Sequence, residues 1–531
     1  MDEPETGIIL WAIEWINENL TKLGATAVYT LFLMTIMGLL RGFIRKRRQH
    51  DEDSKQESSF RKLCKYESAL DTLHKYGGSI TANVLLVRSR VSVSTSKVRR
   101  ALSCLTKRHP LLRTMIDRRK VYFDGKKRIE KYLKEMEVTN FAEHHLRLKA
   151  TTADKWITVF ERELQKQFPP KGPLWRFVML KEQFDPEKKT YFNAFVLSTH
   201  FLICDGVSAL AFFKEFLDYL NSEGQDVENE TSFKLLPTFS NLIHHHASAK
   251  SLSALLDERA KTIIHKLFSR LQTKAQKPCK NIFTSKFSPV ILKNPTVFKK
   301  TCILPMSLSK IEVNQLVRVC QKRQCTVHGA FTAAASIAMS VLLDDSDNEG
   351  FTTIPASVQI NTRKYCSPVA KTCHLGCFVL NCSFESKAKP SAEFWEVAKY
   401  SSDAIHQAIT EGKHLQGVRL NLPYSSQNIP LGELSNDDTV AGRTADLFNI
   451  SNLGKYVNES FGEGEQPLSF AGFYHAVAEH NVGPVFSHNI ATVNGTLFWG
   501  MTYHTNVVVD KVARNYADLV LATLKKAVEK P

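Results

Sequence analysis

Residues 198–210 read STHFLICDGVSAL, a stretch that joins a strand-like run to a helical one. The apolar and aromatic run at 191–199 predicts a buried β-strand, and the apolar spacing at 207–220 predicts an amphipathic helix. His200 therefore stands at the end of a strand, and an aspartate–glycine pair at 205–206 stands where a helix begins. A histidine at such a strand end has two interpretations, a group that does chemistry and a buried structural residue.

Four further short segments stand out along the chain. They are RHPLLRT at 108–114, VHGAFTAA at 327–334, INTR at 360–363 and ISNLG at 450–454. Strand-like and helical stretches mix in both halves, which indicates two α/β lobes with a site between them. The length agrees with this, because 531 residues exceed what one simple core supports.

In their order, these segments resemble those of the coenzyme A-dependent acyltransferase superfamily. That superfamily includes chloramphenicol acetyltransferase, peptide-synthetase condensation domains, plant BAHD acyltransferases, alcohol acetyltransferases and mycobacterial polyketide-associated acyltransferases. The resemblance covers residues 66–531, and the missing plant DFGWG motif favours the alcohol-acetyltransferase or condensation-like branch. It implies an α/β fold of two chloramphenicol-acetyltransferase-like lobes, a V-shaped pseudo-dimer with a central tunnel.

The central motif of this superfamily is HHxxxDG, and the resemblance assigns roles to its residues. The second histidine is the general base, and the aspartate is structural and pairs with an arginine. This chain reads HFLICDG, so His200 matches the first histidine and Phe201 stands at the position of the base. Asp205 and Gly206 match the DG pair, and Arg363 of the INTR segment is the expected partner of Asp205.

Phenylalanine cannot accept a proton, so three hypotheses about the chemistry stay open. In the first, a bulge or twist at the strand end turns His200 into the tunnel and makes it the catalytic base. If the strand register holds instead, Phe201 faces the tunnel and His200 faces the lobe interior. In the second hypothesis another imidazole is the base, and the histidines near family segments are His328, His374, His475 and His480. In the third, the chemistry is lost and the tunnel binds an acyl chain, a lipid or a protein partner.

The same spacing, HxxxxD, also occurs in the glycerolipid acyltransferases. Other segments of that family are missing here, so we interpret the spacing as a coincidence. The 11 cysteines are scattered without a CxxC pair, which signals neither a zinc site nor a disulfide framework. Cys204 is accordingly interpreted as a buried thiol.

A formal net charge of +17 favours an anionic partner, either a membrane surface or a phosphate-bearing substrate such as an acyl-coenzyme A thioester. Nucleic acid is disfavoured because no nucleic-acid-binding signature is present. We expect acyl-coenzyme A as co-substrate, no bound cofactor and no metal. The candidate phosphate contacts are Lys274, Lys277, Lys280 and Lys286. The resemblance places Asn452 and Gly454 near the thioester or its oxyanion, and Phe201 against the substrate.

Residues 23–44 indicate a membrane anchor. No charged side chain occurs at 23–40, and the span reaches about 20 apolar residues if Arg41 extends to the headgroups. The basic cluster RKRR at 45–48 follows, so the positive-inside rule places the body in the cytosol, with the endoplasmic reticulum as the default membrane. The alternative interpretation is a buried core helix.

We expect a single-pass, monomeric protein with six segments. It consists of an N-terminal segment at 1–22, the anchor at 23–44, a tether at 45–65, a first lobe at 66–235, a basic linker at 236–295 and a second lobe at 296–531. A basic amphipathic helix within the linker fits either a membrane surface or packing on the body. The predicted activity is acyl transfer from acyl-coenzyme A to a hydroxyl or amine of a hydrophobic acceptor. The competing prediction is a non-catalytic binding protein on the same scaffold.

Overall fold

The computed structural model describes only part of the chain. The described residues are 60–75, 77–123, 126–136, 145–222, 230–244, 282–287, 300–344, 350–415, 446–456, 467–478, 483–505 and 507–529. The predicted anchor, residues 45–59 of the tether, His480 and most of the basic linker lie outside them. Residues 60–62 at the end of the predicted tether form a β-strand. From residue 62 onward, the described residues belong to one compact unit.

The first sheet has the strand order β13-β2-β8-β6-β5, with β7 added beside β8. The bounds are β2 (Ile80–Ser89), β5 (Leu146–Thr152), β6 (Trp175–Lys181), β7 (Gln183–Asp185), β8 (Thr190–His200) and β13 (Leu468–Val477). All its pairs are antiparallel except β5 with β6. The predicted strand at 191–199 is therefore a central strand of this sheet.

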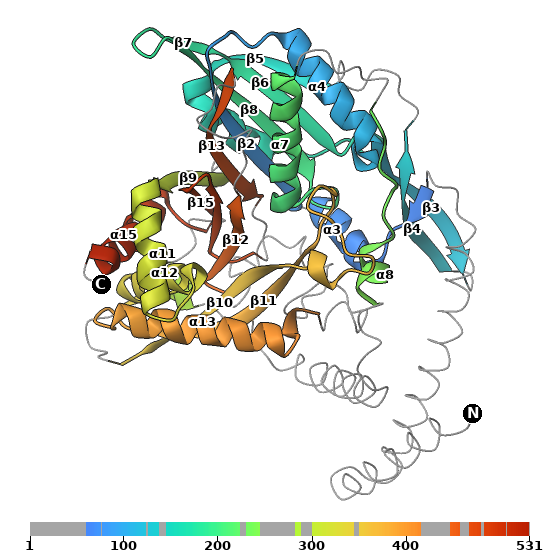
Figure 1. Ribbon diagram of the computed structural model, residues 1–531. Helices are drawn as coiled ribbons and strands as arrows, with labels where there is room; N and C mark the ends of the chain where they lie inside the picture. Colours follow the sequence, from blue (N-terminus) through green and yellow to red (C-terminus); the bar gives the residue numbers. More distant parts are fainter. Residues whose placement is uncertain are drawn as a thin grey trace, which may run out of the picture. The chain divides into compact units, whose positions relative to one another are not determined.

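Helices cover both faces of the first sheet, which explains its nearly continuous apolar strands. Helices α4 (Thr95–Arg108) and α7 (Gly206–Asn221) lie together on one face, as Figure 1 shows. There Leu85 and Phe195 pack in one core with Phe216 of α7. On the other face, α6 (Trp156–Leu164) packs in a separate core with Val84 and Val196. Alternate residues of one strand thus enter different cores.

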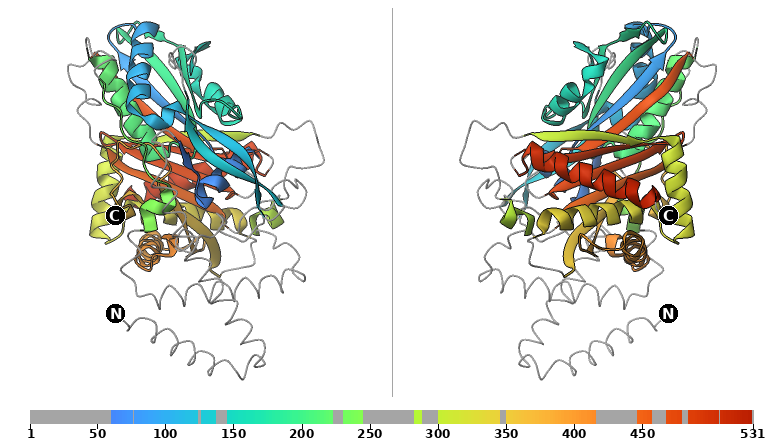
Figure 2. Two further views of the ribbon diagram at one scale, coloured as in Figure 1. Left: turned by 90° about the vertical axis from the view of Figure 1, so that its right-hand side faces the viewer. Right: turned by 90° about the vertical axis from the view of Figure 1, so that its left-hand side faces the viewer.

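The second sheet has the order β11-β10-β12-β14-β15-β9. The bounds are β9 (Thr301–Leu308), β10 (Thr352–Asn361), β11 (Val379–Ala388), β12 (Phe448–Tyr456), β14 (Phe486–Val493) and β15 (Thr496–His504). Its helices are α11 (Lys310–Lys322), α12 (Val327–Leu343), α13 (Phe394–Thr410) and α15 (Asp510–Glu529). Figure 2 shows α15 against this sheet, where Tyr516 stacks on Phe486 with 4.3 Å between ring centroids.

Strand β13 connects the two halves of the chain. It lies at 468–477, in the half of the sequence that builds the second sheet, but it pairs with β2 at the edge of the first sheet (Figure 1). A sequence division at residue 296 assigns this strand to the second lobe, whereas hydrogen bonding assigns it to the first sheet.

A small third sheet, β1-β4-β3, stands apart from the other two. Its strands are β1 (Phe60–Lys62), β3 (Thr114–Phe123) and β4 (Lys126–Glu135). The remaining short helices are α3 (Lys65–Lys75), η1 (Pro110–Arg113), η2 (Ala153–Lys155), α8 (Phe239–His244), α10 (Ile282–Lys286) and η5 (Arg363–Tyr365).

None of the described helices is by itself long and apolar enough to cross a membrane. Helices α11 and α12 reach the required length and apolar character only when they are counted together, and a 96° bend separates them.

Candidate active site at the start of helix α7

The Asp-Gly pair forms the N-terminal cap of α7. Asp205 has extended backbone angles, and its Oδ1 accepts a hydrogen bond from the Ser208 amide at 2.8 Å. A short carboxylate side chain is well suited to this cap, since it satisfies an amide that lacks a partner within the helix. The cap fixes Gly206 as the first helical residue, directly after the turn that follows β8.

Arg363, from the second half of the chain, forms a two-pronged ion pair with Asp205. Its Nη1 lies 2.9 Å from Oδ2 and its Nη2 lies 3.0 Å from Oδ1. The carboxylate also accepts from the Phe378 amide at 3.0 Å, and Arg363 donates to the Ser208 hydroxyl at 2.8 Å. Burial opposes the charged form of Asp205, but the Arg363 charge and these hydrogen bonds outweigh it, so the Asp205 pKa lies below its ordinary value. The predicted partner of Asp205 is therefore in contact with it.

His200 is turned into the first half of the chain. The residue is 1% exposed, its Nδ1 accepts from the Leu202 amide at 3.1 Å, and its ring lies 4.8 Å from that of His74. Its Nε2 is buried and has no hydrogen-bond partner among the residues that the structure describes. Burial, followed by His74, lowers the pKa of His200 to about 3, and the charges that act on it are those of Asp71, Arg118 and Lys131. The side chains of His74, Asp71, Arg118 and Lys131 all come from positions before residue 201.

Phe201 is partly buried, and its side chain packs against the core shared by α4 and α7. Its amide donates to the Ser79 carbonyl at 2.8 Å. The turn from 201 to 204 is therefore held at both ends, by this bond and by the cap at Asp205.

His475 lies on β13, directly opposite Asn83 of β2. Its Nδ1 is 2.7 Å from the Asn83 side-chain oxygen. The imidazole is 4% exposed, and its Cδ2 lies 3.3 Å from the position that a Cβ on Gly206 would occupy. Burial lowers the pKa of His475 to about 4, against the opposing effect of the nearby Asp205 carboxylate. The crossing strand thus brings a second imidazole to the first residue of α7.

The ISNLG segment forms a bulge at the end of β12. The register with β14 shifts between Asn452 and Lys455, Gly454 has a φ of +93°, and its amide donates to the Asn452 side chain at 2.9 Å. This bulge places the methyl groups of Leu453 2.6 and 2.9 Å from the Cβ position of Gly206. A side chain at 206 would meet these methyl groups, so the flexible Leu453 side chain would have to move to make room for it.

Of the other predicted histidines in the described ranges, His374 lies beside Arg363 and His328 lies on α12. The Nδ1 of His374 accepts from the Lys371 amide at 3.2 Å, and its carbonyl lies 3.4 Å from Arg363 Nη2. His328 is in the first turn of α12, with a buried Nε2 that has no hydrogen-bond partner in the described ranges. Of the predicted phosphate contacts, only Lys286 is described, and it donates to the Asp344 carbonyl at 2.7 Å.

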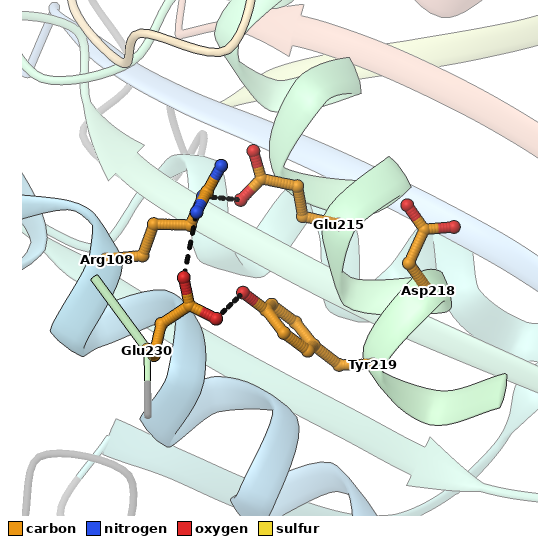
Figure 3. A pocket seen from close by; sticks show the side chains of 5 residues that line it. All are labelled: Arg108, Glu215, Asp218, Tyr219 and Glu230. Carbon is orange, nitrogen blue, oxygen red and sulfur yellow. Dashed lines mark hydrogen bonds and ion pairs between the residues drawn. The ribbon is translucent and has the colours of Figure 1, made fainter. Parts of the chain in front are cut away.

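The RHPLLRT segment builds a polar cluster at the end of α4 rather than part of the Asp-Gly site. Arg108 lies between two carboxylates, 3.2 Å from Glu215 and 2.8 Å from Glu230, and Tyr219 donates to Glu230 at 2.6 Å. These side chains line a cavity of about 260 Å³ in which Asp218 points apart from the other four (Figure 3). The segment therefore ties α4 to α7. Within the described ranges, no group of three or more His, Cys, Asp or Glu side chains could hold a metal ion.

A sequence model of alcohol acetyltransferases matches residues 140–525, which include the Asp-Gly cap, Arg363, the bulge and β13. The chain belongs to the alcohol acetyltransferase family. This confirms the predicted superfamily, and membership of the alcohol acetyltransferase family makes the chain an acyltransferase. No curated protein matches it.

Three solved structures have a fold similar to that of this chain. The trichothecene 15-O-acetyltransferase from Fusarium sporotrichioides is 12% identical over 88% of this chain and 95% of its own, with a TM-score of 0.62. Polyketide synthase associated protein 5 from Mycobacterium tuberculosis is 12% identical over 88% of this chain and 98% of its own, with a TM-score of 0.57. The condensation domain of Monacolin K polyketide synthase is 11% identical over 89% of this chain and 98% of its own, with a TM-score of 0.54. At these identities, the likeness shows the fold alone.

Proposed function

We propose that the protein transfers an acyl group from a coenzyme A thioester to the hydroxyl of a lipophilic alcohol, with an amine as the alternative acceptor. The observation that carries this proposal is the family match, because it spans both halves of the chain and the Asp205–Arg363 pair between them. In the proposed reaction a base removes the hydroxyl proton and the oxygen attacks the thioester carbonyl. The carbon–sulfur bond then breaks, and the thiolate leaves with that proton as free coenzyme A.

The side chains around the Asp-Gly cap support a lipophilic acceptor. Partly buried apolar and aromatic residues pack at the edge of the α4–α7 core, where Leu453 lies against Gly206. These residues include Phe201, Leu453 and Tyr456. Such side chains favour alkyl chains and ring systems over polar acceptors. We propose that they line the substrate tunnel of the superfamily, with Asn452 and Gly454 near the thioester.

We further propose that residues 23–44 anchor this body to the endoplasmic reticulum membrane, with the body on the cytosolic side. The support is the apolar span followed by the basic cluster at 45–48. An alcohol dissolved in the bilayer would then reach the enzyme by lateral diffusion, and the acyl-coenzyme A thioester would arrive from the cytosol.

A second candidate function is binding without catalysis. The observation that favours it is Phe201 at the family's base position, together with the burial of His200 in the first half of the chain. In that case acyl-coenzyme A or a lipid would bind near Gly206 and remain unchanged.

The test uses the full-length protein in detergent micelles or lipid nanodiscs. Acetyl-, octanoyl- and palmitoyl-coenzyme A are each supplied with a long-chain alcohol, a sterol or a phenolic acceptor. Free thiol is followed by colour and the ester by mass spectrometry, with a reaction that lacks the acceptor as the control for hydrolysis. Acyl transfer predicts equal amounts of thiol and ester. Saturable thioester binding without any ester would favour the binding function and contradict our proposal.

A further inference from the structure

The proposed reaction needs a group that accepts a proton beside the Asp-Gly cap, and the end of β8 does not supply one. Phe201 has no basic atom. His200 is 1% exposed, and it lies among His74, Asp71, Arg118 and Lys131 of the first half. A base must come within hydrogen-bond distance of the proton that it removes, so the other imidazole beside the cap is the one to consider.

The hydrogen bonds of Asn83 assign the tautomer of His475. The Asn83 amide nitrogen lies 3.4 Å from both the Thr81 hydroxyl and the Leu197 carbonyl, so its oxygen is the atom that faces His475. An amide oxygen only accepts, and therefore Nδ1 of His475 carries the hydrogen at 2.7 Å. The lone pair is then on Nε2, which makes no hydrogen bond within the described part of the chain.

The free edge of this imidazole faces the cap of α7. Cδ2, the carbon bonded to Nε2, lies 3.3 Å from the Cβ position of Gly206. Because residue 206 has no side chain, the Leu453 side chain occupies the space beside that edge. Its flexible methyl groups lie 2.6 and 2.9 Å from the Cβ position of Gly206. A substrate that displaces the Leu453 side chain would meet the His475 edge and the start of α7 together.

We propose that His475 is the general base of the acyl transfer and that Asn83 is the residue that positions it. This inference rests on the proposed function. In the reaction, Nε2 takes the proton of the acceptor hydroxyl while the oxygen forms its bond to the thioester carbonyl. The tetrahedral intermediate then expels the thiolate as the carbon–sulfur bond breaks, and His475 returns the proton to that sulfur. The base is thus not at the end of β8 but on β13, which lies on the far side of β2 in the same sheet.

The charges around His475 are compatible with this role. Burial keeps its pKa at about 4, so the imidazole is neutral at pH 7 and its lone pair is available. Asp205 is the charged group that opposes this shift, and its charge is balanced by Arg363. The protonated imidazole formed during the reaction would be stabilised by the same Asp205 carboxylate and by the Asn83 oxygen.

The experiment compares His475→Gln with His200→Gln in the full-length protein. We expect His475→Gln to lower kcat by about 10²–10⁴-fold with a smaller change in the KM for the acyl donor, since a general base contributes in that range. His200→Gln should keep kcat within about threefold. If His475→Gln keeps wild-type kcat, or if His200→Gln is the variant that loses it, the inference fails while the proposed function stands. A wild-type protein that forms no ester overturns the proposed function and this inference with it.

A second variant guards against a merely structural effect of the substitution at 475. Asn83→Asp places a carboxylate on Nδ1 and should raise the pKa of the base, so the acidic limb of the kcat/KM profile should move upward from about pH 4 by at least one pH unit. Thermal unfolding of each variant is measured in parallel. An acidic limb that Asn83→Asp leaves in place would show that His475 is not the titrating base.

Discussion

At position 201 a phenyl ring stands where the family's proton transfer would use an imidazole. The residues that surround this position are nevertheless held as the resemblance implies, because Asp205 caps α7 and Arg363 binds both of its oxygens. These two roles could be predicted from the short segments alone. The relation of His475 to Gly206 could not, since it depends on a strand pairing between Asn83 and His475, which lie 392 positions apart.

The Asp205–Arg363 pair yields a prediction about stability. Arg363→Ala would leave a buried carboxylate without its cation, which typically costs about 3–5 kcal/mol of unfolding free energy at neutral pH. Lys399→Ala, in an exposed pair with Asp403, is the control and should cost less than about 0.5 kcal/mol. Urea unfolding measures both. A cost for Arg363→Ala no greater than that of the control would contradict the prediction.

The same pair has a defined pH dependence. The pKa of Asp205 is lowered in the folded state from its ordinary 3.8, so its contribution is present above that value and is lost as the pH falls through the folded pKa. The difference between wild type and Arg363→Ala should therefore shrink below about pH 3.8.

At the level of elements, helices α12 and α13 pack very closely. A Cβ on Gly329 would lie 1.9 Å from the Ser402 hydroxyl and 2.6 Å from the Ala398 carbonyl. Ser402 also accepts from the Thr326 amide at 3.0 Å and so joins the cap of α12 to α13. Gly329 therefore serves helix packing, although glycine lowers the intrinsic propensity of a helix.

We expect Gly329→Ala to destabilise the protein by about 1–3 kcal/mol, the usual cost of overpacking a tight contact. Ser402→Ala should restore only part of that loss, because the Ala398 carbonyl remains in the way. Val341→Ala, at a half-exposed position of the same helix, is the control for a change in α12 that touches no neighbour closely. Equal midpoints of thermal unfolding for Gly329→Ala and wild type would rule out this contact as a constraint.

The elements that were predictable are those with an uninterrupted apolar pattern. The sequence predicts a helix at 327–343, and α12 has those bounds. In contrast, α13 was not predicted, because the buried serines Ser401 and Ser402 interrupt its apolar face where it meets Gly329. The β3–β4 hairpin was missed for a similar reason, since charged side chains occupy both of its faces.

At the level of the whole molecule, buried neutral histidines occur in both halves. Burial lowers the pKa to about 4 for His74 and His475 and to about 3 for His200 and His488. Their ordinary pKa is 6.5, so the unfolded chain binds protons in a range where the folded chain does not. Stability is therefore present in full above pH 6.5 and is lost as the pH falls through the folded values.

We predict that the unfolding free energy falls from pH 6.5 to pH 4, with a slope of up to about 1.4 kcal/mol per pH unit for each buried histidine. Urea unfolding at half-unit pH steps measures it. His488→Gln, which removes the histidine bonded to Trp499 and Tyr516, should reduce the slope. A stability that stays constant between pH 6.5 and 4.5 would contradict the prediction.

Strand β13 also has a consequence for how the chain is made. The edge of β2 pairs with residues 468–477, so the first sheet cannot be completed until the ribosome has synthesised residue 477. At about 5–20 residues per second, the 392 positions between Asn83 and His475 take roughly 20–80 seconds. During that time this edge of β2 has no native neighbour, and unpaired strand edges of this kind promote aggregation. The site beside Gly206 consequently forms only after His475 of β13 has been synthesised.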